Sequence, residues 1–354
     1  MTESYDIIIV GGGLSGLYIA TELAKDKTKT FKLLEASSQL GGRLQNDCRD
    51  NKIDVGGAWI WPQHQPNMKS LVKNLGIDTF PQPDDYSSTR VVNGAADIIE
   101  RLSLPLKDFI ETGCPINSCT QLNLNNKEDG DMCIELKSLS EKTFTAKKVI
   151  FATPPRILAQ HVSFHPPLSE KKMEAMYKSQ TWMAGVSKVA LVYNSPLFIY
   201  SESNKALRAY PNHPAFQVYD GSPKDKSISV LTFFTLASLC DDGSNDEMLA
   251  KQCAKQFTDA LSPSTIRANP YLVEGIQSFD SFHVKHWPKE RYISDDEMPT
   301  TINPHPSPVK ELAATEWNER LFFAGSETDQ TSPGVMEGAV GSAIRVLEQI
   351  KSLS

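Results

Sequence analysis

The sequence is poor in cysteine, and its cysteines are badly spaced for a shared site. Six of them, at positions 48, 114, 119, 133, 240 and 253, are spread over 354 residues. None forms a C-x-x-C pair, the spacing that zinc and redox sites use. The acidic loop 241–246 does not fit an EF-hand, because its glycine is misplaced and no glutamate occupies position 12. We therefore expect reduced intracellular thiols, no disulfide framework and no metal site.

The chain also lacks an excess of positive charge. It carries 36 Lys and Arg residues against 43 Asp and Glu residues, which gives a formal net charge of −7. The electric field of a protein with this net negative charge repels nucleic acid and anionic membrane surfaces. No basic cluster along the chain opposes this field. We therefore expect a small-molecule partner and neither nucleic acid nor membrane.

A long apolar segment is missing as well. The apolar run from Ile7 to Ala20 is rich in glycine and shorter than the ~20 residues that a membrane-spanning helix requires. Only Met1 to Tyr5 precede the opening stretch that starts at Asp6 and holds the first predicted strand, too few for a secretory leader, and no hydrophobic tail follows the last predicted helix. We therefore expect a soluble, cytoplasmic protein. Its 40% hydrophobic content can fill a large core, and its length favours two domains.

What the chain does have is a strand, a glycine-rich turn and a helix at its start. Ile7 to Val10 form a continuous apolar run that is typical of a strand buried on both faces. Gly11, Gly13 and Gly16 follow as G-x-G-x-x-G, and apolar residues at helical spacing come next. These glycines allow a tight turn, a close approach of a pyrophosphate to the backbone, and close packing of helix on strand. The pattern predicts a dinucleotide site.

An acidic residue ends the second predicted strand. Phe31 to Leu34 read as this strand, and Glu35 follows 19 residues after Gly16. A carboxylate there accepts hydrogen bonds from a ribose 2′-OH, which favours an unphosphorylated ribose. The opening of the chain therefore predicts a Rossmann-type α/β domain.

Four ordered motifs resemble the flavin-containing amine oxidase superfamily. Leu40-Gly41-Gly42-Arg43 follows the acidic residue, and Asp54-Val55-Gly56-Gly57-Ala58-Trp59-Ile60 resembles the segment that runs under the flavin. Near the far end, Leu321-Phe322-Phe323-Ala324-Gly325-Ser326-Glu327 resembles the last strand and turn of the family. Gly334-Val335-Met336-Glu337-Gly338 resembles the start of the helix beneath the isoalloxazine. The resemblance implies FAD as cofactor.

The resemblance also assigns roles to individual residues. Arg43 would face the pyrophosphate, Glu327 would bond the ribitol, and the N–H of Met336 would face flavin O2. Ile116 matches a strand that contacts the adenine, and Trp287, spaced W-x-x-x-x-Y with Tyr292, matches a neighbour of the flavin. The predicted cofactor-binding residues are Gly11, Gly13, Ser15, Gly16, Glu35, Ala36, Gly42, Arg43, Gly57, Ala58, Trp59, Ile60, Ile116, Trp287, Gly325, Ser326, Glu327, Val335 and Met336.

The catalytic side of the site departs from the family. Amine oxidases usually hold a lysine, linked through water to flavin N5, after the Pro-Pro that ends at Pro155. Counting forward from Pro155 puts Gln160 at the position of this lysine, and counting back from Pro166 puts His161 there. His161 is a candidate acid or base. Lys188 falls inside the predicted strand Val186 to Tyr193 and is interpreted as structural. Asp246 to Leu261 read as a helix, with Asn245 as its cap.

The aromatic cage and the covalent flavin tether are not visible either. Members of the family flank the substrate with two aromatic rings that stand over the flavin. In this chain Glu297 or Met298 occupies the position of the first ring, and Val335 occupies that of the second. Thr331-Ser332-Pro333 occupies the stretch where some members carry the tethering cysteine, so bound FAD should be noncovalent. Pro81 to Ser88 read as a loop. Only a few residues separate Ile77 from the turn at 90–96, where full-size members carry a helical block. The chain is therefore a compact form of the family.

The combined expectation is a flavoprotein with an FAD domain in three stretches and a reduced, β-rich substrate domain. We expect the FAD domain at 1–77, 94–155 and 287–354, and the substrate domain at 78–93 and 156–286. The predicted activity is that of an oxidoreductase: hydride transfer from a C–H beside an amine nitrogen to flavin N5, with dioxygen as acceptor. Two alternatives stay open, a renalase-like oxidase of dihydronicotinamides or other electron-rich molecules and a non-catalytic flavin-bearing scaffold. The oligomeric state is also open.

Overall fold

The chain divides into two units, each assembled from separate stretches of sequence. The computed structural model describes residues 3–46, 53–83, 85–123, 132–195, 197, 205–239, 245–295 and 305–353. Unit 1 comprises Met1–Arg43, Ile98–Trp182 and Pro304–Ser354, and unit 2 comprises Leu44–Asp97 and Met183–Asn303.

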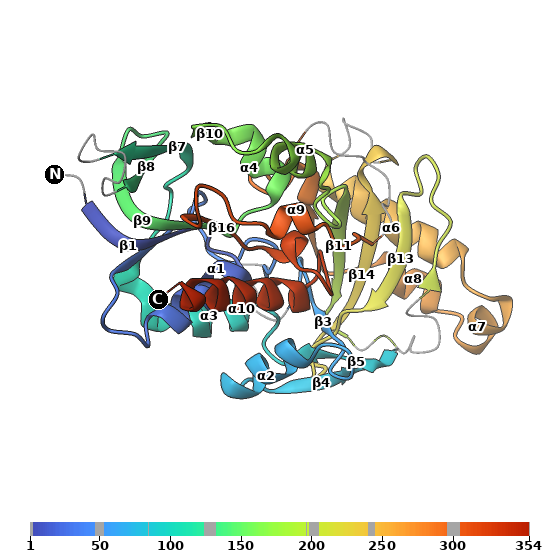
Figure 1. Cartoon of the computed structure of the whole chain (residues 1–354). Helices are drawn as coiled ribbons and strands as arrows, with labels where there is room; N and C mark the ends of the chain where they lie inside the picture. Colours follow the sequence, from blue (N-terminus) through green and yellow to red (C-terminus); the bar gives the residue numbers. More distant parts are fainter. Residues whose placement is uncertain are drawn as a thin grey trace. The chain divides into compact units, whose positions relative to one another are not determined.

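The centre of unit 1 is a group of parallel strands (Figure 1). β1 (Glu3–Val10) pairs in parallel with β2 (Phe31–Leu34) on one side and with β9 (Thr143–Phe151) on the other. β16 (Leu321–Phe323) pairs in parallel with the end of β9. The apolar residues of these strands are buried because both faces of a parallel sheet are covered. The predicted Rossmann-type α/β core is therefore confirmed.

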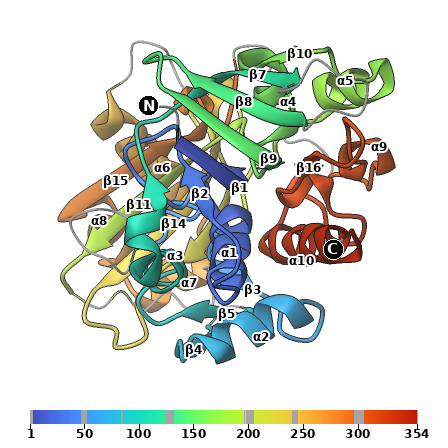
Figure 2. The same cartoon turned by 60° about the vertical axis from the view of Figure 1, so that its left-hand side comes forward.

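The same sheet continues in both directions from this centre. Its strand order is β10-β7-β8-β9-β1-β2-β6, with antiparallel pairing among β7, β8 and β9. Figure 2 shows β9, β8 and β7 following one another outward from β1. The remaining strands of the sheet are β6 (Ile110–Glu111), β7 (Ile116–Asn123), β8 (Met132–Ser138) and β10 (Ser163–His165).

Two helices from opposite ends of the chain pack together in unit 1. α1 (Leu14–Leu23) follows the glycine-rich turn, and α10 (Met336–Ser352) closes the chain. They lie side by side (Figures 1 and 2). The other helical segments of this unit are η1 (Leu104–Phe109), α4 (Pro155–His161), α5 (Glu170–Lys178), α9 (Lys310–Ala313) and η4 (Ser326–Thr328). α3 (Ala96–Ser103) begins in unit 2 and ends in unit 1.

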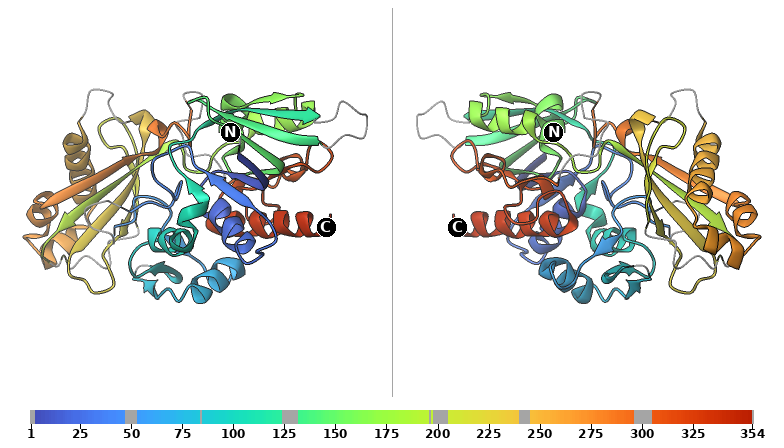
Figure 3. Two further views of the ribbon diagram at one scale, coloured as in Figure 1. Left: turned by 90° about the vertical axis from the view of Figure 1, so that its left-hand side faces the viewer. Right: turned by 90° about the vertical axis from the view of Figure 1, so that its right-hand side faces the viewer.

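Unit 2 contains an antiparallel sheet in the order β12-β13-β14-β11-β15. Its strand β11 (Val186–Tyr193), where the sequence predicts a strand, is buried along its whole length. The other strands are β12 (Lys205–Ala206), β13 (Ala215–Asp220), β14 (Ser229–Leu236) and β15 (Ser281–His286), and the short helix η2 (Ala237–Leu239) follows β14. One face of the sheet carries helices, which Figure 3 shows edge-on.

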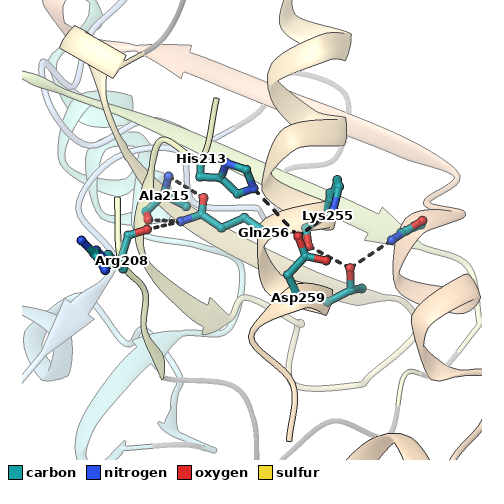
Figure 4. Close-up of polar contacts among 8 residues, drawn as sticks. Arg208, His213, Ala215, Lys255, Gln256 and Asp259 are labelled. Carbon is teal, nitrogen blue, oxygen red and sulfur yellow. Dashed lines mark hydrogen bonds and ion pairs between the residues drawn. The ribbon is translucent and has the colours of Figure 1, made fainter. Parts of the chain in front are cut away.

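The helices on this face are α6 (Asp246–Asp259), α7 (Pro263–Ala268) and α8 (Leu272–Gln277). The predicted cap of α6 is confirmed, since the Asn245 side chain accepts a hydrogen bond from Met248 N–H at 2.8 Å. Gln256 ties this helix to the segment before β13 (Figure 4). Its Nε2 donates to the carbonyls of Arg208 and Ala215, and its Oε1 accepts from Ala215 N–H.

A smaller sheet in unit 2 has the order β3-β5-β4. It comprises β3 (Trp59–Ile60), β4 (Thr79–Gln82) and β5 (Asp85–Val91), and α2 (Pro66–Asn74) connects the first two. The prediction of a loop over 81–88 was wrong, because Pro81 sits on an edge strand where its missing N–H costs no ladder bond. A β-hairpin thus occupies the place where full-size relatives were expected to carry helices.

The two compact units do not share the bounds of the predicted domains. Residues 44–77 pack within unit 2, although they were predicted in the FAD domain, and residues 156–182 pack within unit 1. Buried hydrogen bonds from Lys188 and Trp287 to the segment 54–56 explain the first difference. In the part of the chain that the structure describes, no helix is both long and apolar enough to cross a membrane.

Candidate FAD and catalytic sites

The turn between β1 and α1 requires glycine at two positions, because a side chain there would clash with the backbone of the protein itself. Gly11 has φ +112, and a Cβ on it would lie 2.6 Å from the Ala152 carbonyl oxygen. A Cβ on Gly16 would lie 2.0 Å from the carbonyl oxygen of Gly11. Both positions therefore hold the helix close to the ends of the parallel strands.

Gly13 is different, because the protein does not demand a glycine there. Its φ of −78 and ψ of −175 suit any residue, and an added Cβ would meet only the Gly41 carbonyl oxygen, at 4.0 Å. Gly13 is also the N-cap of α1 and provides no side-chain cap. The turn thus leaves space beside helix amides that lack intrahelical acceptors, which is the arrangement that a pyrophosphate requires.

The carboxylate of Glu35 lies at the same turn. It accepts hydrogen bonds from Gly12 N–H at 2.6 Å and Ser37 N–H at 2.8 Å. Burial raises the pKa of Glu35, and these backbone donors oppose that shift. The Glu35 carbonyl accepts from Cys114 N–H at 2.8 Å, which brings the segment leading to Ile116 beside the acid. Ile116 itself is buried at the start of β7, and Ala36 is half-buried.

The Gly41-Gly42-Arg43 segment joins the first crossover to the end of the chain. Gly41 N–H donates to the Gly12 carbonyl at 2.9 Å, and a Cβ on Gly42 would lie 3.6 Å from Gly13 Cα. The guanidinium of Arg43 binds both carboxylate oxygens of Glu327, at 2.7 and 2.9 Å. It also donates to Ser326 Oγ at 2.9 Å.

The charge of Glu327 depends on this contact. Burial raises the pKa of the carboxyl, but the Arg43 guanidinium and the other hydrogen bonds to the carboxylate, including that from Ser326, together outweigh burial, and the pKa falls below its ordinary value. Glu327 is therefore ionised at neutral pH. The structure brings together Arg43, Ser326 and Glu327, which the sequence placed at opposite ends of the chain.

Two serines connect the turn before η4 to both long helices. Gly325 N–H is shared between Ser15 Oγ at 3.2 Å and Ser342 Oγ at 3.1 Å, and the two hydroxyls lie 3.2 Å apart. Gly325 has φ +102 and packs on Thr153. The Thr153 hydroxyl is buried and finds no partner in the described residues. This orphaned donor and the uncapped helix fit a bound dinucleotide.

The start of α10 also lacks a side-chain cap. Val335 is its N-cap and Met336 its first residue, so the first amides of the helix have no acceptor within it. Gly338 has to be glycine, because a Cβ would lie 2.1 Å from the Ser332 carbonyl oxygen. A helix start of this kind favours negative charge.

In unit 2 the segment before β3 is held by three buried donors. Ala95 N–H donates to Asp54 Oδ1 at 2.7 Å, Trp287 Nε1 donates to the Val55 carbonyl at 3.0 Å, and Lys188 Nζ donates to the Gly56 carbonyl at 2.8 Å. Downstream of these anchors, Gly57 is exposed, Ala58 and Ile60 are buried, and Trp59 is half-buried.

Lys188 lies inside β11 and was interpreted from the sequence as structural. Its side chain is 2% exposed, and its Nζ lies 5.0 Å from the ring centroid of Trp59 and 5.3 Å from that of Phe234. Burial lowers its pKa to about 8, which Asp54 opposes and Arg90 reinforces. A lysine inside the apolar run 186–193 was itself a signal, because lysine is almost never fully buried without a partner or a task.

The predicted catalytic positions are placed differently. Gln160 and His161 are the last two residues of α4, and both are exposed. Glu297 and Met298, the expected positions of the first cage ring, lie outside the described residues.

Comparisons with known proteins agree with this assembly. Residues 86–350 match the family described as flavin containing amine oxidoreductase, and residues 9–75 match an NAD(P)-binding Rossmann-like domain. A probable flavin-containing monoamine oxidase A of Dictyostelium discoideum is 35% identical over 95 residues, which cover 27% of this chain and 20% of that protein. The (S)-6-hydroxynicotine oxidase of Paenarthrobacter nicotinovorans is 31% identical over 105 residues, 28% of this chain and 24% of that protein.

The matched segments span less than a quarter of these curated relatives' lengths. Among solved structures, putrescine oxidase bound to putrescine has a TM-score of 0.76 at 16% identity, covering 99% of this chain and all of that one. Cyclohexylamine oxidase of Brevibacterium oxydans has a TM-score of 0.75 at 15% identity and covers 99% of both chains. These two likenesses concern the fold.

Proposed function

The chain belongs to the flavin containing amine oxidoreductase family, and from that premise we propose that it is an FAD-dependent oxidoreductase of amines. The substrate would lose hydride from a C–H beside its amine nitrogen, and water would hydrolyse the resulting imine. Dioxygen is the proposed acceptor. The relatives that share parts of the sequence include a probable flavin-containing monoamine oxidase A and an (S)-6-hydroxynicotine oxidase, which supports an amine as substrate.

One observation carries the cofactor assignment. The glycine-rich turn, the Arg43 segment and the Gly325 turn converge within unit 1 through the Arg43–Glu327 and Ser15–Gly325–Ser342 contacts. We propose that the pyrophosphate lies at Gly13 and the first amides of α1, that Glu35 binds the adenosine ribose, and that Ile116 contacts the adenine. Met336 N–H would stabilise negative charge on the reduced ring.

Bound FAD would supply the hydride acceptor, while the chain's own residues orient the amine and manage its proton. No cysteine stands at Thr331 or Ser332, whose amides bind Asp329 Oδ2 at 3.0 and 2.7 Å. We therefore propose noncovalent FAD.

We propose Lys188 as the proton-handling group in place of Gln160 or His161. It is buried, its pKa is lowered to about 8, and its Nζ holds the carbonyl of Gly56. The next residue, Gly57, starts the stretch that the family places along the flavin. A buried amine with a pKa near neutrality can take or release the proton of a substrate ammonium, directly or through water.

The test is anaerobic mixing of the purified flavoprotein with a panel of primary and secondary amines and, separately, with dihydronicotinamides. Loss of the flavin absorption band with at least one amine is the expected result. Bleaching by dihydronicotinamides alone would replace this proposal with the renalase-like alternative. Bleaching by neither class would support a non-catalytic flavoprotein.

A further inference from the structure

The two faces of the larger sheet in unit 2 carry aromatic residues of different exposure. On the face that α6 covers, Phe233 meets Phe257 edge-on, and both rings are fully buried. Because side chains alternate along a strand, Phe234 lies on the opposite face, in register with Lys188 of β11. Phe234 is only half-buried. The face turned away from α6 therefore keeps aromatic surface exposed.

Four half-buried rings form one contiguous group around Phe234. The ring centroid of Trp59 on β3 lies 4.8 Å from that of Tyr219 and 6.0 Å from that of Phe234. Tyr219 meets Phe234 edge-on at 5.6 Å, and Phe216 stacks on Phe234 at 5.9 Å. We call these four residues, Trp59, Phe216, Tyr219 and Phe234, the aromatic group. Clustered rings that stay half-exposed are typical of surfaces that bind the apolar part of a small molecule.

The Trp59 ring is held in one orientation by a buried side chain. Its Nε1 donates to Gln82 Oε1 at 3.0 Å, and Gln82 Nε2 donates to the carbonyl of Asp220 at 2.9 Å. Gln82 is fully buried, so this link is shielded from water. A ring fixed in this way loses little conformational entropy when a ligand packs against it. The aromatic group is therefore a preorganised surface.

The amine of Lys188 already lies against two of these rings. Its Nζ is 5.0 Å from the ring centroid of Trp59 and 5.3 Å from that of Phe234, and it donates to the carbonyl of Gly56 at 2.8 Å. The lysine thus uses the cation–π attraction of Trp59 and Phe234. What these rings offer a ligand is apolar contact, which suits the carbon body of an amine better than its charged nitrogen.

The strands that carry this face offer no negative charge to a second cationic group. β11, β14 and β15, which the structure describes in full, contain no Asp or Glu. Lys188 instead stands opposite Lys285 of β15, whose Nζ pairs with Glu290. A second ammonium on the substrate would be desolvated beside Lys188 without a carboxylate from these strands, which is costly. The face therefore favours a monoamine over a diamine.

We propose that the aromatic group is a specificity-determining surface, which binds the aryl or cyclic apolar body of a monoamine and disfavours an aliphatic diamine. Ring–ring contacts with an aryl substrate add to the free energy gained by burying its apolar area. The role in substrate choice rests on the proposed function, whereas the binding of an aryl amine to these rings does not.

The first experiment observes binding without turnover. Holoenzyme labelled with fluorotryptophan is titrated with cumylamine, which has no C–H beside its nitrogen and cannot lose hydride to the flavin. Fluorine NMR follows the Trp59 resonance, which Trp59→Phe identifies. Cumylamine should shift this resonance saturably, whereas tert-butylamine, which lacks the ring, should not. A Trp59 resonance that cumylamine leaves in place, or that both amines shift equally, would overturn the proposal.

The second experiment measures substrate choice. The rate constants for anaerobic flavin reduction at low substrate concentration are compared for benzylamine and putrescine. Tyr219→Leu and Phe234→Leu keep an apolar side chain but remove the ring, and each should lower the benzylamine-to-putrescine ratio by about tenfold or more. Phe282→Leu is the matched control, because this half-buried ring of β15 packs on the core beneath α6. Its ratio should stay unchanged, and an unchanged ratio in both test variants would contradict the proposal.

The two experiments separate this inference from the proposed function. If a leucine variant fails to fold, the titration of the unsubstituted chain decides the outcome. A Trp59 resonance that responds to cumylamine in a protein whose flavin no amine reduces would retain the aryl site and remove the amine oxidation. Flavin reduction by amines, with an unresponsive Trp59 resonance, would retain the oxidation and remove the aryl site.

Discussion

The guanidinium of Arg43 donates hydrogen bonds to both carboxylate oxygens of Glu327, a residue 284 positions later in the chain. Within unit 1 this contact joins the segment that follows the first crossover to the turn at Glu327. It joins a residue expected at a pyrophosphate to one expected at a ribitol. The ion pair therefore contributes to the free energy of unfolding of the apoprotein, which can be measured apart from cofactor binding.

Arg43→Ala should destabilise the apoprotein by about 3 kcal/mol, because it leaves the Glu327 carboxylate buried and unpaired. Urea unfolding at neutral pH measures the effect. The pKa of Glu327 is lowered in the folded state, so the stabilisation is present above the ordinary pKa of 4.5 and is lost as pH falls through the folded value. Lys25→Ala, which breaks an exposed pair with Glu22, is the control and should cost under about 1 kcal/mol. Equal effects of the two variants would contradict the prediction.

Gly13→Ala should leave the fold intact and weaken FAD binding by about tenfold or more. The protein leaves room for a Cβ at this position, so only the ligand would meet the added methyl group. Gly16→Ala should instead lower the thermal stability of the apoprotein, since its Cβ would clash with the Gly11 carbonyl. Flavin fluorescence quenching and thermal unfolding separate the two effects. Gly275→Ala in α8 is the matched control, and normal FAD affinity in Gly13→Ala would refute the placement of the pyrophosphate.

Lys188→Met should slow anaerobic flavin reduction by about 10²-fold or more at saturating amine, because it removes the proposed proton-handling group. His161→Ala should leave the rate unchanged, since that side chain is exposed at the end of α4. Stopped-flow absorbance at the flavin band measures both. The reverse pattern, with a slow His161 variant and a normal Lys188 variant, would restore the assignment made from the sequence.

The stability of the apoprotein should depend on pH through Lys188. Its folded pKa of about 8 lies below the ordinary value of 10.5, so the unfolded chain binds more protons between these two pH values. Stability relative to Lys188→Met should therefore rise by about 2–3 kcal/mol from pH 8 to pH 10.5 and be lost again as pH falls. Denaturant midpoints across this range provide the measurement. A flat difference would show that Lys188 titrates normally in the folded state.

Gln256→Ala should destabilise unit 2 by about 2 kcal/mol, because it removes the bonds to Arg208 and Ala215 and leaves buried backbone groups unpaired (Figure 4). Lys255→Ala, on the same helix but exposed and paired with Asp259, should change stability by under about 0.5 kcal/mol. Chemical unfolding followed by circular dichroism distinguishes them.

The features that sequence patterns predicted correctly are those that depend on local chemistry. The apolar run at 7–10 and the predicted strand at 186–193 are both buried strands, and Asn245 caps the helix that it precedes. The glycine-rich turns were recognised by their spacing, and at Gly11 and Gly16 close packing leaves no other residue a place. The family resemblance came from the same turns.

What the sequence did not reveal depends on pairing across long separations. The strand β4 contains Pro81 and looked like loop, because only its pairing with β5 makes it a strand. Neither the burial of Lys188 against Trp59 nor its contact with Gly56 is visible in a linear pattern. Spacing from Pro155 pointed to Gln160 and His161, although the chain folds both onto an exposed helix end.

The central claim is that the turns at both ends of the chain form one FAD site. The most direct test is to purify the full-length protein, record its absorption spectrum and identify the flavin released by heat denaturation. The account predicts a yellow protein that releases an equimolar amount of FAD, without covalently retained flavin. A colourless protein that takes up no added FAD, or one that releases another nucleotide, would contradict it.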